Sequence, residues 1–179
     1  MGFIELSVDG VYRAEVENFN AIFLRSVHNP EWVLPLWVTE HMAGLVEDRL
    51  NDRSPRRPDC YELLADAWCV LVKEVAIISY YDGLCLADIV FNDEKRTDAK
   101  PSDAVLLAMH LRVPIMIDED TFHKIAIFAG TASVPELFEN GPSVGEPEYI
   151  DIDGFLNELF GSGDDNGLGD NPDGNRSDT

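Results

Sequence analysis

The stretch DAKPSDAVLLAMHLRVPIMIDED, Asp98–Asp120, carries the clearest signals for the fold. Its Pro101-Ser102-Asp103 segment is typical of a helix start, with Ser102 as a candidate N-cap and Asp103 placed favourably for the helix dipole. The letters AVLLAMHLR then predict the helix itself. After it, VPIMID indicates a short buried strand, and EDTFHKIAIF indicates a short helix or an irregular edge.

Two apolar runs upstream of this stretch predict a hairpin. They are Lys73–Tyr80 and Leu84–Phe91, and the Asp-Gly pair between them provides the positive-φ positions that a tight hairpin needs. The next segment, Asn92–Lys100, predicts a turn at Asn92-Asp93 and then a more polar strand of the kind found at a sheet edge. These three strands are predicted to lead into the helix that begins near Ser102.

The N-terminal part of the chain shows the same order of strands followed by a helix. Strands are predicted at Phe3–Val8, at Glu15–Ser26 and, after a turn at His28–Glu31, at Trp32–Val38. A helix is predicted from Thr39, a plausible N-cap, because apolar residues then recur at helical spacing; these are Met42, Leu45, Val46 and Leu50.

A loop rich in proline and arginine separates this helix from the next one. The loop reads DRSPRRP, its prolines break the helix, and it contains Arg53, Arg56 and Arg57. Asp59 and Glu62 then have the spacing of a capping box, which predicts a second helix start. The apolar face of this second helix is predicted to consist of Leu63, Leu64, Ala67, Trp68 and Leu71.

Hairpins mixed with helices favour an α+β fold over a doubly wound sheet. We expect residues 1–129 to form one domain, with a mixed, largely antiparallel sheet and three main helices. Residues 130–148 are rich in proline and poor in apolar residues, which predicts a linker. Residues 149–160 predict a short amphipathic helix, and residues 161–179, rich in Gly, Asp and Asn, predict a disordered acidic tail.

The chain is strongly acidic, with 34 Asp and Glu against 13 Lys and Arg and a formal net charge of −21. Residues 1–129 contain 22 acids and 12 bases, so the predicted domain has a net charge of −10. Proteins that bind nucleic acid usually carry a basic stripe that neutralises phosphates. The charge therefore disfavours nucleic acid as a partner.

Other features of the sequence bear on its cellular location. The three cysteines are widely spaced and form no CxxC pair, which suits a reducing compartment. The apolar runs are far shorter than the ~20 residues of a membrane-spanning helix, and no signal peptide is visible. We expect a cytoplasmic protein without a membrane segment.

The common motifs of nucleotide-binding, hydrolase and metal sites are absent from the sequence, and its four histidines are scattered. The most suggestive cluster is Asp98–Asp103, because a helix start presents free amides and the ammonium of Lys100 can help to neutralise a phosphate there. The same residues also fit a capped helix beside a solvated lysine. Local chemistry leaves both interpretations open.

Several blocks in this order resemble the bifunctional nuclease family. They are LPLWV at Leu34–Val38, RRP at Arg56–Pro58 before a capped helix, YDGLCLADIVF at Tyr81–Phe91, and above all Asp98–Asp120. The resemblance extends roughly from Phe3 to Phe128. The central signature of the family is a basic residue followed by Pro-Ser-Asp-Ala, and this chain has Lys100 where arginine is usual.

The resemblance implies a compact α+β domain, usually dimeric, in a family named for hydrolysis of both RNA and DNA. Two departures bear on that activity. Where the family usually has Thr-His-Asp, this chain has Cys60-Tyr61-Glu62 and thus lacks a histidine that could act as acid or base. Lys100 also lacks the bidentate geometry with which arginine binds phosphate.

Two functions compete at this point. A weak or metal-assisted nuclease would use the catalytic residues Asp103, Lys100 and Glu40, and would bind substrate through Ser102, Arg56 and Arg57. A divalent cation such as Mg²⁺ would be held by Asp98 and Asp103. The alternative is a non-catalytic homodimer that binds a phosphorylated ligand or a protein partner. Each carboxylate also has a structural interpretation, either as a first-turn helix residue or as a charge on an edge strand.

Overall fold

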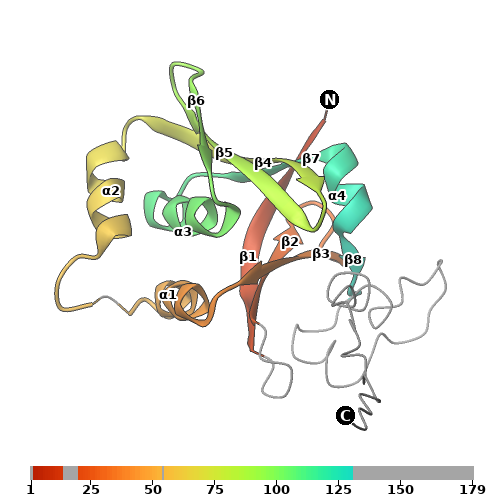
Figure 1. Cartoon of the computed structure of the whole chain (residues 1–179), viewed down its shortest axis with the longest axis horizontal. Helices are drawn as coiled ribbons and strands as arrows, with labels where there is room; N and C mark the ends of the chain where they lie inside the picture. Colours follow the sequence, from red (N-terminus) through yellow and green to blue (C-terminus); the bar gives the residue numbers. More distant parts are fainter. Residues whose placement is uncertain (1, 14–19, 54, 131–179) are drawn as a thin grey trace, which may run out of the picture. The chain divides into compact units, whose positions relative to one another are not determined.

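One mixed sheet organises the part of the chain that the computed structural model describes, which comprises residues 2–13, 20–53 and 55–130 (Figure 1). The sheet has eight strands in the order β6-β5-β4-β7-β1-β2-β3-β8. The strands are β1 (Phe3–Arg13), β2 (Asn20–Ser26), β3 (Trp32–Val38), β4 (Val72–Tyr81), β5 (Leu84–Phe91), β6 (Arg96–Ala99), β7 (Ile115–Asp118) and β8 (Ile127–Phe128). Neighbouring strands are antiparallel except for β4 and β7, which are parallel. The predicted α+β fold with a largely antiparallel sheet is thus confirmed.

Some predictions lie outside the described residues. These are most of the linker at 130–148, the amphipathic helix at 149–160, the acidic tail at 161–179, and the first part of the strand predicted at Glu15–Ser26. Among the described residues, no helix has the length and hydropathy that crossing a membrane requires.

The first strand is longer than predicted. The predicted strand ends at Val8, whereas β1 continues to Arg13. Asp9 has no partner residue in the register of β1 with β2, which shifts between Val8 and Gly10 and so forms a β-bulge. The Asp9 carboxylate lies 2.8 Å from the guanidinium of Arg25 on β2, and this ion pair accompanies the bulge.

The described residues contain four helices: α1 (Glu40–Leu50), α2 (Cys60–Trp68), α3 (Pro101–Leu111) and α4 (Glu119–Ile125). The predicted N-cap of α1 is confirmed, because the Thr39 hydroxyl accepts a hydrogen bond from the Met42 amide at 3.3 Å. The capping box of α2 is also confirmed, with Asp59 accepting from the amide of Glu62 at 2.9 Å and Glu62 accepting from the amide of Asp59. Local signals were sufficient for both helix starts.

The predicted N-cap of α3 is wrong by two residues. Lys100 occupies the N-cap position and makes no side-chain capping bond, and Pro101 is the first helical residue. Proline is favoured at that position because its fixed φ suits the helix and its missing N–H would have no partner there. Ser102 therefore lies inside the first turn, and its side chain is buried.

The hairpin between β4 and β5 is confirmed at the level of its turn. Asp82 and Gly83 both have positive φ, at 49° and 80°, which is the pattern of a type I′ turn. The turn predicted at Asn92-Asp93 is also confirmed, because the Glu94 amide donates to the Phe91 carbonyl across it at 2.9 Å, and a positive φ of 63° follows at Glu94. The edge strand β6 then pairs with β5 as expected.

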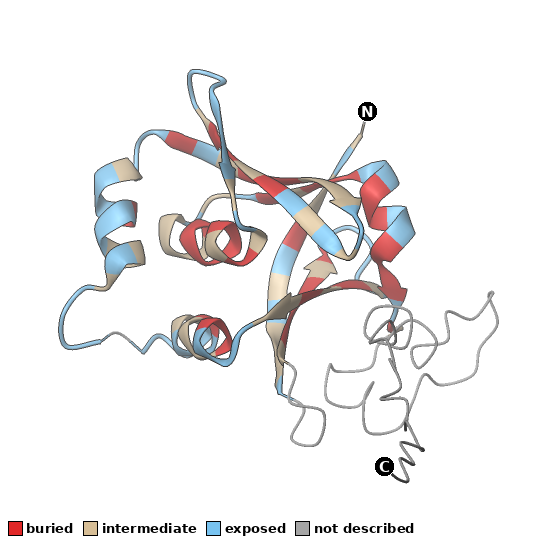
Figure 2. Cartoon of the chain, viewed as in Figure 1, coloured by how far each residue is buried: buried red, intermediate tan, exposed pale blue. Residues whose placement is uncertain are grey.

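The main hydrophobic core lies between the sheet and α1 and α3. Figure 2 shows α3 as the most deeply buried helix, in agreement with its buried residues Ser102, Ala104, Val105, Leu106, Leu107 and Ala108. They pack with inward residues of the strands such as Leu24, Leu34 and Ile77. The short helix α4 packs against β1, β4 and β7, away from the other three helices in Figure 1.

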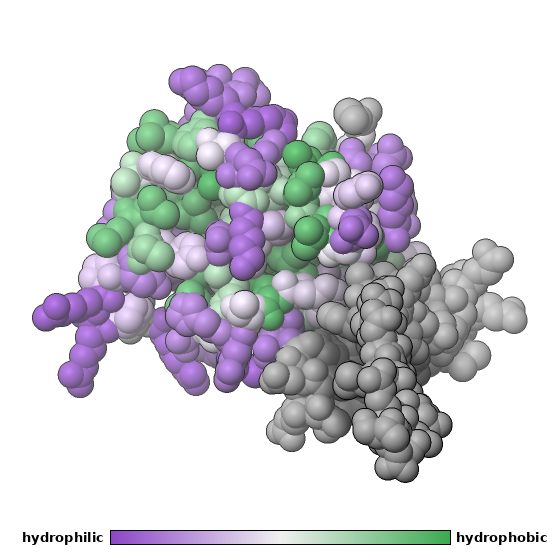
Figure 3. Space-filling view, in the orientation of Figure 1, coloured by the Kyte–Doolittle hydropathy of each residue, from purple (hydrophilic) through white to green (hydrophobic). Residues whose placement is uncertain are grey.

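The predicted apolar face of α2 is wrong except at Trp68. Leu63 and Leu64 are 57% and 37% exposed, and Ala67 is exposed as well. The residues that pack inward are Tyr61, Ala65 and Trp68, which follow one another at intervals of four and three along the helix. Because α2 lies mainly against α3 and reaches the sheet through the edge-on contact of Trp68 with Phe91 of β5, only this narrow stripe is covered. Hydrophobic surface remains over α2 (Figure 3).

Candidate functional site

The starts of α2 and α3 are joined by a hydrogen bond between side chains. The Tyr61 hydroxyl donates to Oδ1 of Asp103 at 2.9 Å. Tyr61 is in the first turn of α2 and Asp103 is in the first turn of α3, so the bond brings together two helix starts from distant parts of the sequence. The predicted site residue Asp103 therefore has a partner that the sequence did not reveal.

The start of α3 retains groups that suit an anion. The first main-chain amide that bonds within the helix is that of Ala104, which donates to the Lys100 carbonyl at 2.9 Å. The amides of Ser102 and Asp103 precede it, and such first-turn amides have no partner within the helix. In the described part of the chain, the exposed ammonium of Lys100 forms no ion pair.

Ser102 is buried, with only 2% of its surface exposed, and its hydroxyl has no hydrogen-bond partner among the described residues. The sequence predicted that this side chain binds substrate. In this structure the hydroxyl faces the interior, so of Ser102 only the main-chain amide is left for the predicted contact with substrate.

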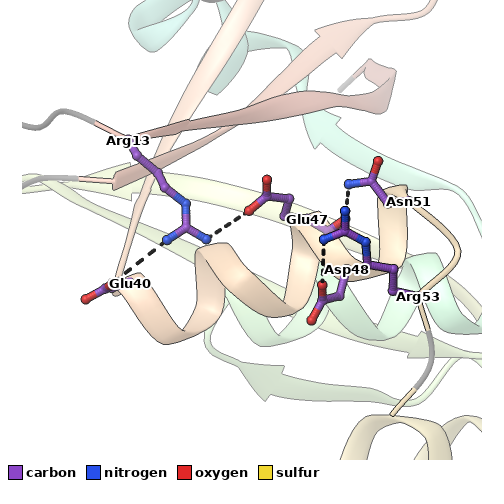
Figure 4. Close-up of polar contacts among 6 residues, drawn as sticks. All are labelled: Arg13, Glu40, Glu47, Asp48, Asn51 and Arg53. Carbon is purple, nitrogen blue, oxygen red and sulfur yellow. Dashed lines mark hydrogen bonds and ion pairs between the residues drawn. The ribbon is translucent and has the colours of Figure 1, made fainter.

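The three arginines of the loop before α2 have different environments. Arg53 lies 3.7 Å from the carboxylate of Asp48 on α1 (Figure 4). Arg56 and Arg57 are exposed, lie just before the capping residue Asp59, and have no ion pair within the described ranges. Two of the three predicted bases thus remain available for a negatively charged ligand near the start of α2.

Glu40 has a different partner from the one its predicted role requires. Its carboxylate lies 4.0 Å from Arg13, which is also paired with Glu47 at 2.9 Å (Figure 4). The Glu40 side chain is 86% exposed. Among the described residues, no hydrogen bond or ion pair links Glu40 to Lys100 or Asp103.

Asp98 lies on the edge strand β6, directly opposite Asp88 on β5. Asp88 has Arg96 at 3.5 Å, and Asp98 itself is exposed. Within the described ranges, no three His, Cys, Asp or Glu side chains are grouped so that they could hold a metal ion. The donors present do not form a complete metal centre, so the predicted metal ligands Asp98 and Asp103 stay a prediction.

The environment of Tyr61 keeps its hydroxyl group protonated. Burial raises the pKa of Tyr61 well above its usual value, and the hydrogen bond to Asp103 and the negative charge of Asp103 raise it further. The hydroxyl is therefore protonated at physiological pH and donates to the carboxylate. Tyr61 can orient Asp103 but cannot accept a proton from it.

Tyr61 is the site residue that sequence reasoning missed. It stands where the resemblance to bifunctional nucleases leads one to expect histidine, and from the sequence alone it is only a departure from the family. A signal was nevertheless present: Tyr61, Ala65 and Trp68 share one side of α2, which is the spacing of a buried helix stripe.

Fold and helix starts together define a class of protein: an α+β domain in which a Pro-Ser-Asp-Ala helix start is joined to a second capped helix. The sequence profile of the bifunctional nuclease domain matches residues 22–129, which is more than half of the chain. The chain belongs to the bifunctional nuclease domain family. Uncharacterized proteins from two strains of Mycobacterium tuberculosis are similar to it, at 29% identity over 118 residues, covering 64% of this chain and 71% of the relatives.

Proposed function

We propose that the protein is a weak nuclease that hydrolyses phosphodiester bonds of RNA and DNA at the joined starts of α2 and α3. The observation that carries this proposal is the 2.9 Å bond from Tyr61 to Asp103, because it holds a carboxylate beside the first-turn amides of α3. Family membership supports the class of reaction. The uncharacterized relatives add no activity of their own.

The distribution of positive charge supports the location. Half of the twelve bases in the described residues are ion-paired with carboxylates: Arg13, Arg25, Arg53, Lys73, Lys95 and Arg96. Three of the six that lack such a pair, Arg56, Arg57 and Lys100, belong to the segments that lead into α2 and α3. An acidic chain of this kind can attract a polyanion only where bases remain unpaired.

In the proposed chemistry, one phosphate of the substrate lies against the amides of Ser102 and Asp103 and the ammonium of Lys100. A water molecule attacks the phosphorus and transfers a proton to the Asp103 carboxylate, while the bond from phosphorus to the leaving oxygen breaks. Lys100 stabilises the added charge and donates a proton to the leaving oxygen. Arg56 and Arg57 bind neighbouring phosphates, and Tyr61 keeps Asp103 oriented throughout.

The test compares cleavage of single-stranded RNA and DNA by the wild type and Asp103→Asn, purified side by side so that contaminating nucleases are matched. Asp103→Asn should lower cleavage by about 100-fold or more, and Lys100→Ala by about tenfold. Arg53→Gln is the matched control, because Arg53 is already paired with Asp48 and should be dispensable. Equal cleavage by wild type and Asp103→Asn would exclude this site.

Two further measurements of cleavage test the predicted roles of Asp98 and Glu40. If EDTA abolishes cleavage and Mg²⁺ restores it, a cation held by Asp98, Asp103 and substrate phosphates takes part, because Mg²⁺ often uses only one or two protein carboxylates. If Glu40→Gln leaves cleavage unchanged, Glu40 serves only its pairing with Arg13. Binding of the oligonucleotides without any cleavage would favour the alternative, a non-catalytic binding module.

We also propose that the protein is a homodimer located in the cytoplasm. The exposed apolar residues of α2 and the segment after it, Leu63, Leu64, Val70 and Leu71, form surface that a second copy could cover. Light scattering should then give a mass of about twice the 20.0 kDa chain, and Leu63→Lys with Leu71→Lys should return the mass to that of one chain. A wild-type mass of one chain at micromolar concentration would refute the dimer.

A further inference from the structure

A groove lies at the opposite end of α3 from the proposed nuclease site. It has a volume of about 500 Å³ and is bounded by β1, by the C-terminal ends of α1 and α3, and by the segment that leads into β7. A volume of this size is typical of pockets that bind small molecules. The nuclease proposal assigns this groove no role.

Four charged side chains line the groove: Glu5, Arg49, Asp52 and Arg112. Arg49 donates to the Met109 carbonyl at 3.3 Å rather than to a carboxylate. Within the described residues, none of the four is ion-paired, so the opposite charges around this groove lie more than 4.0 Å apart. Of the ten other bases in the described residues, six form direct ion pairs.

The remaining wall of the groove is largely apolar, with side chains that include Leu6, Val8, Leu50 and Ile115. Polar and apolar lining of this kind suits a ligand that has charged groups at one end and a hydrocarbon body at the other. The separated charges provide partners for both a negative and a positive group on that ligand.

We propose that this groove binds a small zwitterion, an α-amino acid with an apolar side chain. Arg112 and Arg49 bind its carboxylate, Glu5 and Asp52 bind its ammonium group, and the apolar wall covers its side chain. A phosphate or polyphosphate fits less well, because two carboxylates and the C-terminal ends of two helices surround the groove with negative charge. An amine without a carboxylate would leave both guanidinium groups unpaired.

The backbone at Arg112 provides a clean variant. Arg112 is the C-cap of α3 and has a left-handed φ of 59°, a conformation that favours glycine. Arg112→Gly therefore removes the guanidinium group from the groove without disturbing the end of α3. Its matched control is Lys124→Gln, which removes an exposed cation on α4 that lies outside the groove.

The experiment titrates the isotope-labelled full chain with L-leucine and follows main-chain amide signals by NMR. Two parallel titrations use 4-methylpentanoate, which lacks the ammonium group, and 3-methylbutylamine, which lacks the carboxylate. Leucine should give saturable shifts at residues of β1 and at the ends of α1 and α3, and each analogue should bind about tenfold more weakly or worse. Inorganic phosphate should give no saturable shifts in the groove.

The variants complete the test. Arg112→Gly should weaken leucine binding by about tenfold or more while its thermal midpoint stays at or above that of the wild type, and Lys124→Gln should leave binding unchanged. The proposal is overturned if leucine gives no saturable shifts, if 4-methylpentanoate or phosphate binds as tightly as leucine, or if Arg112→Gly binds leucine normally. These readouts involve no nuclease assay, so they stand apart from the proposed activity.

Discussion

The Tyr61 hydroxyl and the Asp103 carboxylate, 42 positions apart in the sequence, form a 2.9 Å hydrogen bond that joins the starts of α2 and α3. Both side chains are partly buried, and Tyr61 packs against the main core. A hydrogen bond to a charged acceptor in such a place contributes more to stability than one on an open surface. The same bond therefore serves both the packing of α2 and the orientation of the proposed catalytic carboxylate.

Tyr61→Phe should lower the free energy of unfolding by about 1 to 3 kcal/mol, because it keeps the ring in place and removes only the hydroxyl that satisfies Asp103. Urea denaturation at pH 7 measures the change. Tyr81→Phe, at an exposed position at the end of β4, provides a tyrosine control outside this helix contact. A Tyr61→Phe variant as stable as the wild type would show that the bond contributes nothing measurable to folding.

Alkaline pH should reduce the difference in the free energy of unfolding by which the wild type exceeds Tyr61→Phe. The pKa of Tyr61 is raised in the folded protein, mainly by burial and then by Asp103, from the 10.0 of an unperturbed tyrosine. The contribution of the Tyr61 hydroxyl to the free energy of unfolding is therefore fully present below pH 10. It is lost as the pH rises above 10, where the unfolded chain can release a proton that the folded chain retains. Urea denaturation of both proteins between pH 8 and about pH 11 measures the difference. An advantage that stays constant across this range would contradict a raised pKa.

Ser102→Ala should leave the protein as stable as the wild type or more stable by up to about 1 kcal/mol. The Ser102 hydroxyl is buried and has no partner in the described part of the chain, so the substitution removes a desolvated polar group without breaking a hydrogen bond. Thermal and urea denaturation measure the change. Ser102→Val, which adds volume in the same buried place, should destabilise and serves as the contrast. Destabilisation by Ser102→Ala would mean that the hydroxyl has a partner after all.

Cys85 should react with a thiol reagent at least about tenfold more slowly than Cys60 or Cys69. Burial raises the pKa of the Cys85 thiol to about 11, whereas Cys60 and Cys69 are exposed. A two-unit rise lowers the thiolate population about 100-fold, and the greater nucleophilicity of the more basic thiolate recovers only part of that loss. Ellman titration at pH 8 of the wild type and of a Cys60→Ser, Cys69→Ser variant should resolve two fast thiols and one slow thiol. A variant that reacts as fast as the wild type would contradict the burial of Cys85.

The sequence by itself determined the elements whose stability depends on neighbours a few residues away. The Thr39 cap and the Asp59–Glu62 capping box each involve residues three positions apart, and the Asp82-Gly83 turn depends on the φ values of two adjacent residues. Their chemistry is complete within one turn of chain, so the pattern of letters was enough. The family signature at Lys100–Ala104 is local in the same way.

The sequence was insufficient wherever a residue's role depends on a distant segment. Leu63 and Leu64 have the spacing of an inward face, yet α2 contacts α3 through Tyr61 and β5 through Trp68, so the two leucines remain exposed. Ser102 fits the pattern of a cap, but Lys100 is the N-cap and Pro101 the first helical residue, so Ser102 is the second helical residue, where the core covers it.

Only the tertiary structure decided which helix starts meet and which strands pair across the chain. The parallel pairing of β4 with β7 and the bond from Tyr61 to Asp103 both join segments separated by about forty residues. Contacts at that separation are set by how the whole core packs. The entropy lost in closing so long a loop is offset by the burial of many side chains at once, not by any local preference.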